Sequence, residues 1–215
     1  MAVKKSGRCV IISGAPNCNA DFIAANILTD DYIICADGGY KYAQKCNIKP
    51  DLFVGDFDSF RGTVQGKTEV IRLKVHKDDT DTMHCAQIAI EKGFSEVVIL
   101  GAIGGRIDHS FANISILQYF ADNNVSAKII TENEILQIVS VGEHSFNNLE
   151  GYTFSVFPFG CNEVIVSYEG DVEYKAQSLT LYSSNPMGVS NIFLSDNVKI
   201  IVKQGYALIV AVKEV

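Results

Sequence analysis

The sequence has little positive charge, no paired cysteine motif and no long apolar run. Its 18 Lys and Arg residues against 25 Asp and Glu give the 215-residue chain a net charge of −7, the wrong sign for binding nucleic acid through its phosphates. No stretch approaches the roughly 18 consecutive apolar residues of a membrane-spanning helix. We therefore expect no nucleic-acid partner and no membrane.

The six cysteines are scattered, at Cys9, Cys18, Cys35, Cys46, Cys85 and Cys161. They form no C-x-x-C pair, and no histidine cluster has the spacing of a zinc site. We expect reduced thiols in the core. The first residues, MAVKKSGRCVIISG, lack the longer apolar region of a signal peptide, and a cytoplasmic location is the expectation.

Two familiar phosphate-binding motifs are also missing. Gly62–Thr68 reads GTVQGKT, one residue too short for the P-loop pattern, and a strand-like run follows it instead of a helix. The segment GAIGG at 101–105 does not match G-x-G-x-x-G. A dinucleotide-binding Rossmann site therefore has no fingerprint here.

The composition, 47% hydrophobic and 20% charged, is that of a globular protein. Up to about residue 125, short apolar runs alternate with segments of helical period, which predicts an α/β fold with a mostly parallel sheet and helices on both faces. The expected strands are Cys9–Ser13, Tyr32–Cys35, Leu52–Val54, Val70–Val75 and Glu96–Leu100. The expected helices are Ala20–Leu28, Tyr40–Cys46, Thr80–Lys92 and Ser110–Ala121.

Beyond residue 125 only short strand-like runs remain, separated by Gly, Asn and Asp turns. They are Ala127–Ile130, Glu134–Val139, Tyr152–Phe157, Glu163–Tyr168, Ile192–Leu194, Val198–Val202 and Ala207–Val212. Alternation within several of them predicts two antiparallel sheets packed as a β-sandwich. The expected domains are an α/β catalytic domain over 1–140 and a β-sandwich domain over 141–215.

Polar residues cluster after four of the predicted strands, where ligands of open α/β sheets bind. In chain order they are Asp37, Gly38 and Gly39; Asp56, Asp58 and Ser59; Lys77, Asp78, Thr80 and Asp81; and Gly104, Gly105, Arg106, Asp108, His109 and Asn113. Taken singly, several of these acids would also serve as turn or helix caps. Together they point to a ligand site at one edge of the sheet.

Carboxylates gathered at one edge require a cation, because two of them about 6 Å apart repel by roughly 3 kcal/mol at an effective dielectric constant near 20. Oxygen ligands without His or Cys favour Mg²⁺, and the candidate ligands are Asp56, Asp58, Asp78 and Asp81. The run from Gly104 to Arg106 offers unobstructed backbone N–H groups and a guanidinium to an anion. The pattern indicates chemistry on a nucleotide with its magnesium.

These segments resemble the thiamin pyrophosphokinase family. Its ADGG, GDFDS, K-D-x-T-D and GGRxDH segments stand in order at Ala36–Gly39, Gly55–Ser59, Lys77–Asp81 and Gly104–His109. Asn113 occupies the position of the family's helix Asn, and Gly188–Asn191 matches its G-[VI]-S-N segment. His76 departs from the pattern, since many members have an acidic residue there.

The resemblance implies transfer of a pyrophosphoryl group from ATP to the hydroxyethyl oxygen of thiamin, with Mg²⁺ required, in a homodimer that binds thiamin at the subunit interface. The residues implied to contact the nucleotide are Asp37, Gly38, Ser59, Lys77, Thr80, Gly104, Gly105, Arg106, His109 and Asn113. The expected catalytic group is Asp56, Asp58, Asp78, Asp81, Arg106 and Asp108, with Asp81 or Asp108 as the base. The thiamin-side candidates are Tyr174, Ser190 and Asn191.

Two other interpretations remain open at this point. A pyrophosphokinase acting on another alcohol, such as a hydroxymethylpterin, would share the Mg²⁺-ATP site. A non-catalytic nucleotide sensor would use the sandwich to bind a partner protein, since fold alone does not determine function. Formation of AMP with thiamin, with another alcohol only, or not at all would distinguish the three.

Overall fold

The structure is a computed structural model that describes residues 7–56, 58, 60, 62–64, 66–74 and 79–214. The chain divides into two compact units, Met1–Glu132 and Asn133–Val215. The expected boundary at residue 140 differs because β7 (Glu134–Val139) pairs along its whole length with β14 (Ala207–Val212) and so belongs to the second unit.

The first unit is built on a parallel sheet with strand order β6-β5-β1-β2-β3-β4. Its strands are β1 (Arg8–Ile12), β2 (Tyr32–Ala36), β3 (Leu52–Gly55), β4 (Glu69–Arg72), β5 (Glu96–Leu100) and β6 (Ser126–Ile130). The central strands are rich in Val, Ile and Leu because both of their faces are covered. This confirms the parallel α/β fold expected from the sequence.

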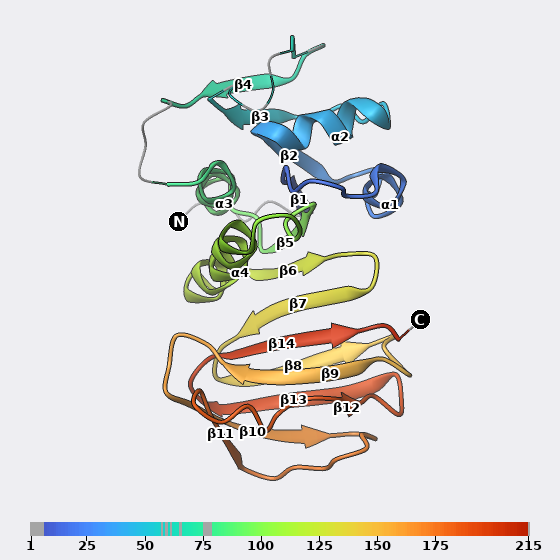
Figure 1. Cartoon of the computed structure of the whole chain (residues 1–215), viewed down its shortest axis with the longest axis vertical. Coiled ribbons are helices and arrows are strands. Elements are labelled where there is room, and N and C mark those ends of the chain that lie inside the picture. The colour runs from blue at the N-terminus through green and yellow to red at the C-terminus, as the bar shows by residue number, and fades with distance from the viewer. Residues whose placement is uncertain are drawn as a thin grey trace. The chain divides into compact units, whose positions relative to one another are not determined.

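Helices cover both faces of this sheet (Figure 1). They are α1 (Ala20–Ala25), α2 (Tyr40–Lys45), α3 (Asp81–Glu91) and α4 (Ile107–Asp122). Val10 and Ile12 of β1 pack in one core with Ile23 of α1 and Ala43 of α2. Because side chains alternate along a strand, the residues between them face the other way, toward α3 and α4.

Two helix ends differ by three residues from the sequence expectation, and the other ends agree within one residue. Helix α4 begins at Ile107 instead of Ser110, and Ile107 is 85% exposed, so the apolar period does not reveal this first turn. Helix α1 ends at Ala25 instead of Leu28, because Asn26 takes the cap position and its side-chain amide donates to the Phe22 carbonyl at 2.9 Å. No helix among the described residues is long and apolar enough to cross a bilayer.

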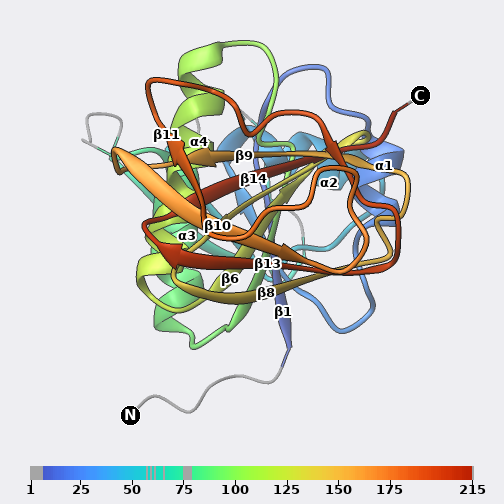
Figure 2. The same cartoon turned by 90° about the horizontal axis from the view of Figure 1, so that it is seen from below.

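The second unit is a sandwich of two antiparallel sheets, with strand orders β12-β9-β14-β7 and β11-β10-β13-β8. Its further strands are β8 (Gly142–Asn147), β9 (Thr153–Pro158), β10 (Glu163–Glu169), β11 (Leu179–Tyr182), β12 (Asn191–Ile192) and β13 (Asn197–Gln204). Strands β8, β13 and β10 lie side by side in Figure 2. Phe154 and Val156 of one sheet share a core with Val166 and Ile200 of the other, as the predicted sandwich requires.

Sequence reasoning missed two strands of this unit, β8 and β11. Strand β8 reads GEHSFN, and only Phe146 in it is buried, so neither apolar alternation nor β-propensity indicates a strand. Its pairing with β13 from Gly142 to Asn147 holds it in the sheet. The four residues of β11 are too few to show a period, and pairing with β10 decides their conformation.

Candidate active site

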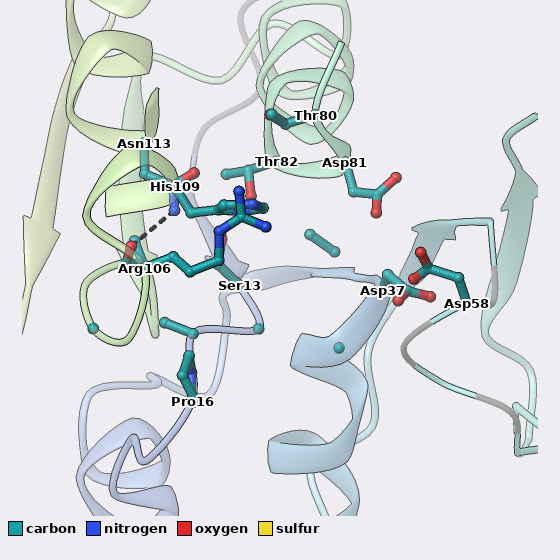
Figure 3. Close-up of a pocket in the computed structure, with 16 residues that line it drawn as sticks. Ser13, Pro16, Asp37, Asp58, Thr80, Asp81, Thr82, Arg106, His109 and Asn113 are labelled. Carbon is teal, nitrogen blue, oxygen red and sulfur yellow. Dashed lines mark hydrogen bonds between the residues drawn. The ribbon is translucent and has the colours of Figure 1, made fainter. Parts of the chain in front are cut away.

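A pocket of about 410 Å³ opens in the first unit at the carboxyl ends of β1, β2, β3 and β5. From β1 the strand order runs to β2 on one side and to β5 on the other, and open α/β sheets bind their ligands at such a reversal. Figure 3 shows the pocket. The residues that line it are Ser13, Gly14, Ala15, Pro16, Ala36, Asp37, Gly38, Asp58, Thr80, Asp81, Thr82, Ala102, Gly104, Arg106, His109 and Asn113.

One end of the pocket is acidic. Carboxylate oxygens of Asp37, Asp56 and Asp58 lie within 4.8 Å of one another, and the Asp58 N–H donates to Asp56 Oδ1 at 3.0 Å. Asp37 is only 3% exposed, whereas Asp58 is exposed. Figure 3 shows the Asp81 carboxylate on the same side of the pocket as Asp37 and Asp58. The predicted convergence of acids thus includes Asp37, which joins the pair from β3.

Glycines hold Asp37 in this position. A Cβ on Gly39 would lie 2.0 Å from the Ile12 carbonyl oxygen, and a Cβ on Gly55 would lie 2.8 Å from Asp37 Cβ. Asp37 itself has φ +27°, a conformation that side chains other than Gly, Asn and Asp seldom adopt. Gly39 therefore lets the ADGG turn lie against the end of β1, and Gly55 leaves room for Asp37 beside the end of β3, where Asp56 and Asp58 follow.

Helix α3 brings Asp81 to the pocket with its first turn. The Thr80 hydroxyl accepts the Met83 N–H at 3.2 Å, which caps the helix. Thr82 is buried, and its hydroxyl hydrogen-bonds to the Ser13 hydroxyl at 2.9 Å. This bond links the start of α3 to the end of β1, so Asp81 is carried on an anchored turn.

The other end of the pocket carries Arg106 and His109 at the start of α4 (Figure 3). Arg106 pairs with Asp108 through Nε and Nη2 at 3.1 and 2.5 Å, and both side chains are largely exposed. This hydrogen bond, with a further one from the His109 N–H, lowers the pKa of Asp108 to about 2. Asp108 does not line the pocket. It directs the guanidinium and stays ionised.

The backbone of the expected anion cradle is partly engaged within the protein. The Gly104 N–H, expected to face an anion, donates to Ser110 Oγ at 3.1 Å, and the Asn113 amide donates to the Ala102 carbonyl at 2.8 Å. Gly104 and Gly105 have φ of +133° and +67°. The glycines are thus needed for the turn itself, while Arg106 is the cation that the turn presents.

Sequence reasoning missed the loop Ser13–Pro16 after β1 and Thr82. The Ala15 N–H donates to the Gly101 carbonyl at 2.9 Å, and the Tyr42 hydroxyl donates to the Ala15 carbonyl at 2.6 Å. The loop therefore connects the strand ends on either side of the reversal. The position of the loop directly after the first predicted strand could have indicated it, but its sequence, SGAP, contains no ionisable side chain.

Comparison with known proteins identifies the family of the chain. The family model described as "Thiamin pyrophosphokinase, catalytic domain" matches residues 23–129. The chain belongs to the thiamin pyrophosphokinase family. It is 27% identical over 167 residues to thiamin pyrophosphokinase 1 of Caenorhabditis elegans, covering 71% of this chain and 68% of that protein. It is 29% identical to the Bacillus subtilis thiamine pyrophosphokinase, over 61% of this chain and 65% of that protein.

Solved structures of this family share the whole fold. The crystal structure of the Bacillus subtilis thiamine pyrophosphokinase superposes with a TM-score of 0.85 at 21% identity, covering 97% of this chain and all of that one. The yeast thiamin pyrophosphokinase superposes with a TM-score of 0.78 at 14% identity. At these identities the likeness establishes the fold, an α/β part followed by a β-sandwich.

The remaining residues expected from the thiamin pyrophosphokinase resemblance fall into two groups. Ser59, Lys77 and Asp78 lie outside the described residues. Tyr174, Ser190 and Asn191 lie in the second unit.

Asn191 holds the backbone of Tyr174. The Asn191 side chain is 6% exposed; its Oδ1 accepts the N–H of Tyr174 and of Ile192, each at 2.9 Å, and its amide donates to the Tyr174 carbonyl at 2.8 Å. The Tyr174 ring is 62% exposed. Ser190 is also exposed, with φ +58°. Asn191 therefore fixes a segment that presents an aromatic ring to solvent.

The carboxylates at the acidic end fit a hard divalent cation. Magnesium ligands lie at about 2.1 Å from the ion, so two oxygens on opposite sides of it are about 4.2 Å apart. This is close to the separation of the carboxylate oxygens of Asp37, Asp56 and Asp58, which lie within 4.8 Å of one another. Without a cation, two carboxylate charges 4.8 Å apart would repel by about 3.5 kcal/mol at an effective dielectric constant near 20. The donor set is oxygen only, which suits Mg²⁺ better than a softer metal.

Proposed function

We propose that this chain transfers a pyrophosphoryl group from ATP to the hydroxyethyl oxygen of thiamin, giving thiamin diphosphate and AMP. The observation that carries the proposal is a pocket, in a member of this family, with carboxylates at one end and a guanidinium at the other. A polyphosphate with its magnesium has the complementary charges. The acceptor follows from the family.

Asp37, Asp56 and Asp58 would hold Mg²⁺, with Asp81 beside them. When bound, the ion would neutralise charge on the phosphate oxygens. Asp78 stays a candidate ligand from the sequence. These carboxylates are carried on the ends of β2 and β3 and on the anchored start of α3, so they are positioned before substrate binds, and positioning is the main source of rate in phosphoryl transfer.

Arg106 would stabilise the negative charge on the phosphates during transfer. Asp108 orients it through the paired hydrogen bonds. With a pKa of about 2, Asp108 is a weak base at neutral pH, so we assign the removal of the hydroxyl proton to Asp81. His109 and Asn113 complete the wall of the pocket beside Arg106.

Thiamin recognition is assigned to the second unit through Tyr174, Ser190 and Asn191. An exposed aromatic face suits the cationic thiazolium ring, and Asn191 would act by holding the Tyr174 backbone. We further propose a cytoplasmic homodimer in which thiamin binds between two subunits. Mixing inactive Asp81→Asn and Tyr174→Ala proteins should then restore about a quarter of the activity, because half of the dimers would be mixed and contain one intact site. No recovery would reject shared sites.

The direct test is incubation of the protein with ATP, Mg²⁺ and thiamin, with AMP and thiamin diphosphate measured by chromatography. Equal amounts of the two products are expected, with none after magnesium is chelated. Asp81→Asn should abolish turnover, and Asp122→Asn, which makes the same charge change at an exposed position at the end of α4, should not. AMP only with a hydroxymethylpterin, or no AMP at all, would overturn the proposal.

A further inference from the structure

Two buried hydroxyl groups lie in the wall of the active-site pocket. Ser13 directly follows β1, and Thr82 is in the first turn of α3; both line the pocket, and they are 2% and 7% exposed. Their oxygens, Ser13 Oγ and Thr82 Oγ1, are 2.9 Å apart, and either hydroxyl can be the donor. Both residues stand outside the four sequence segments that carry the acids and the arginine of the site.

A count of protons shows that this hydroxyl pair is incomplete. A hydroxyl has one proton to donate and two lone pairs that can accept. The bond between Ser13 and Thr82 uses one of the two protons, and neither hydroxyl makes a second hydrogen bond to the described residues. One buried O–H group therefore still requires an acceptor, and buried polar groups in folded proteins rarely lack one.

Thr82 is the member of the pair that faces a ligand. It is the more exposed of the two, and in Figure 3 it lies between Asn113, on α4, and Asp81. Ser13 is more deeply buried, and its backbone N–H is fixed by the Leu100 carbonyl at 2.8 Å. The hydrogen bond then runs from the Ser13 O–H to the Thr82 oxygen. This leaves the Thr82 O–H for the pocket, as a donor that its own accepted bond strengthens.

The surroundings of Thr82 favour an anionic acceptor. Arg106 presents a guanidinium to the same pocket. Thr82 is also the second residue of α3, and the N–H groups in the first turn of a helix have no partner within the helix and attract negative charge. A phosphate oxygen is negatively charged and accepts strong hydrogen bonds. It is therefore the group that would complete the hydroxyl pair.

We infer that the Thr82 hydroxyl donates a hydrogen bond to a phosphate oxygen of the ATP polyphosphate, and that Ser13 positions this hydroxyl. The inference rests on the proposed function. Thr82 thereby contacts the substrate, whereas Ser13 acts only through Thr82. Because both side chains are buried and joined before a ligand binds, the donor needs no reorganisation when charge develops on the phosphates.

Calorimetric binding of inorganic tripolyphosphate with Mg²⁺ tests this without turnover. Thr82→Val keeps the size of the side chain but removes the hydroxyl, and it should weaken binding about tenfold, the scale of one hydrogen bond to a charged acceptor. Thr82→Ser keeps a hydroxyl and should restore most of the affinity. Thr29→Val, which makes the same change at an exposed position between α1 and β2, should bind as wild type does.

The double variant Ser13→Ala/Thr82→Val separates contact with the ligand from a purely structural role. Thr82→Val alone leaves the Ser13 O–H buried without an acceptor and should lower the urea midpoint. Removal of both hydroxyls relieves this cost, so the double variant should be more stable than Thr82→Val. Its affinity for tripolyphosphate should stay about tenfold below that of wild type, because Ser13 acts only through Thr82. Affinity that recovers together with stability would overturn the inference.

The remaining outcomes also decide. Unchanged tripolyphosphate binding in Thr82→Val, or no binding by wild-type protein, would overturn the inference. In turnover assays Thr82→Val should lower kcat/KM for ATP about tenfold with the KM for thiamin unchanged, and an effect confined to the KM for thiamin would assign the hydroxyl to the acceptor instead. If hydroxyl-dependent binding appears but no thiamin diphosphate forms, the proposed function fails while the phosphate contact stands.

Discussion

Gly55, the last residue of β3, leaves the space that Asp37 occupies, and Gly55→Ala tests whether the acidic cluster depends on that space. The new Cβ would lie 2.8 Å from Asp37 Cβ and 2.9 Å from Oδ1, whereas ordinary contacts are 3.4 to 4 Å. The φ of Gly55 is not positive. The contact with Asp37 is therefore the reason that alanine does not fit.

The magnitude follows from this contact. Asp37 is buried between two strand ends, so it must shift by several tenths of an ångström together with its carboxylate. Overpacking of this kind typically lowers the free energy of unfolding by about 1–3 kcal/mol. A displaced catalytic group of this kind costs about 10- to 100-fold in rate. We expect both losses in Gly55→Ala, with a higher Mg²⁺ concentration needed for half-maximal activity.

Urea unfolding and the magnesium dependence of AMP formation measure the two effects. Asp37→Gly is the matched background, because glycine tolerates the φ of +27° and removes the Cβ and Oδ1 that the new methyl group would contact, leaving only the contact with the Cα of residue 37 at 3.0 Å. In that background Gly55→Ala should cost less than about 1 kcal/mol, although the protein stays inactive. Wild-type stability and magnesium response in the single variant Gly55→Ala would refute the reasoning.

Three further predictions follow from single contacts. Asp108→Asn should lower kcat/KM by about threefold, which is the scale of an exposed ion pair. The factor should be the same from pH 5 to 9, because the depressed pKa of about 2 keeps Asp108 ionised in this range and the pairing with Arg106 is lost only as the pH falls through that value. A factor that varies with pH would contradict this. Asn191→Ala should lower the free energy of unfolding by about 3 kcal/mol in urea, since it leaves the Tyr174 N–H and carbonyl without their partner, and unchanged stability would show that the amide is dispensable. Cys35 should resist iodoacetamide in the native protein and react after unfolding, as mass spectrometry can detect, because burial raises the pKa of this fully buried thiol; rapid native labelling would contradict its burial.

Local pattern was enough to predict most of the first unit. Apolar runs and helical periods indicated β1, β2, β3 and β5 and their helices, because strands covered on both faces must be apolar throughout. The motifs at the strand ends also indicated the family and the chemical types of residue that line the pocket. These features depend only on residues that are close together in the chain, so a single sequence is enough to recognise them.

Partners distant in the chain were decided only by the tertiary structure. Asp37 joins Asp56 and Asp58 because β2 and β3 are adjacent and Gly55 leaves room between them. The Gly104 N–H is engaged by Ser110, and the polar segment GEHSFN becomes β8 through its pairing with β13. The order of residues in the chain does not give the distance between such groups. That distance is set by strand order, by register and by the close packing that glycines allow. The sequence alone therefore determined the elements and the chemical types at the site, and the tertiary structure decided which of those groups meet.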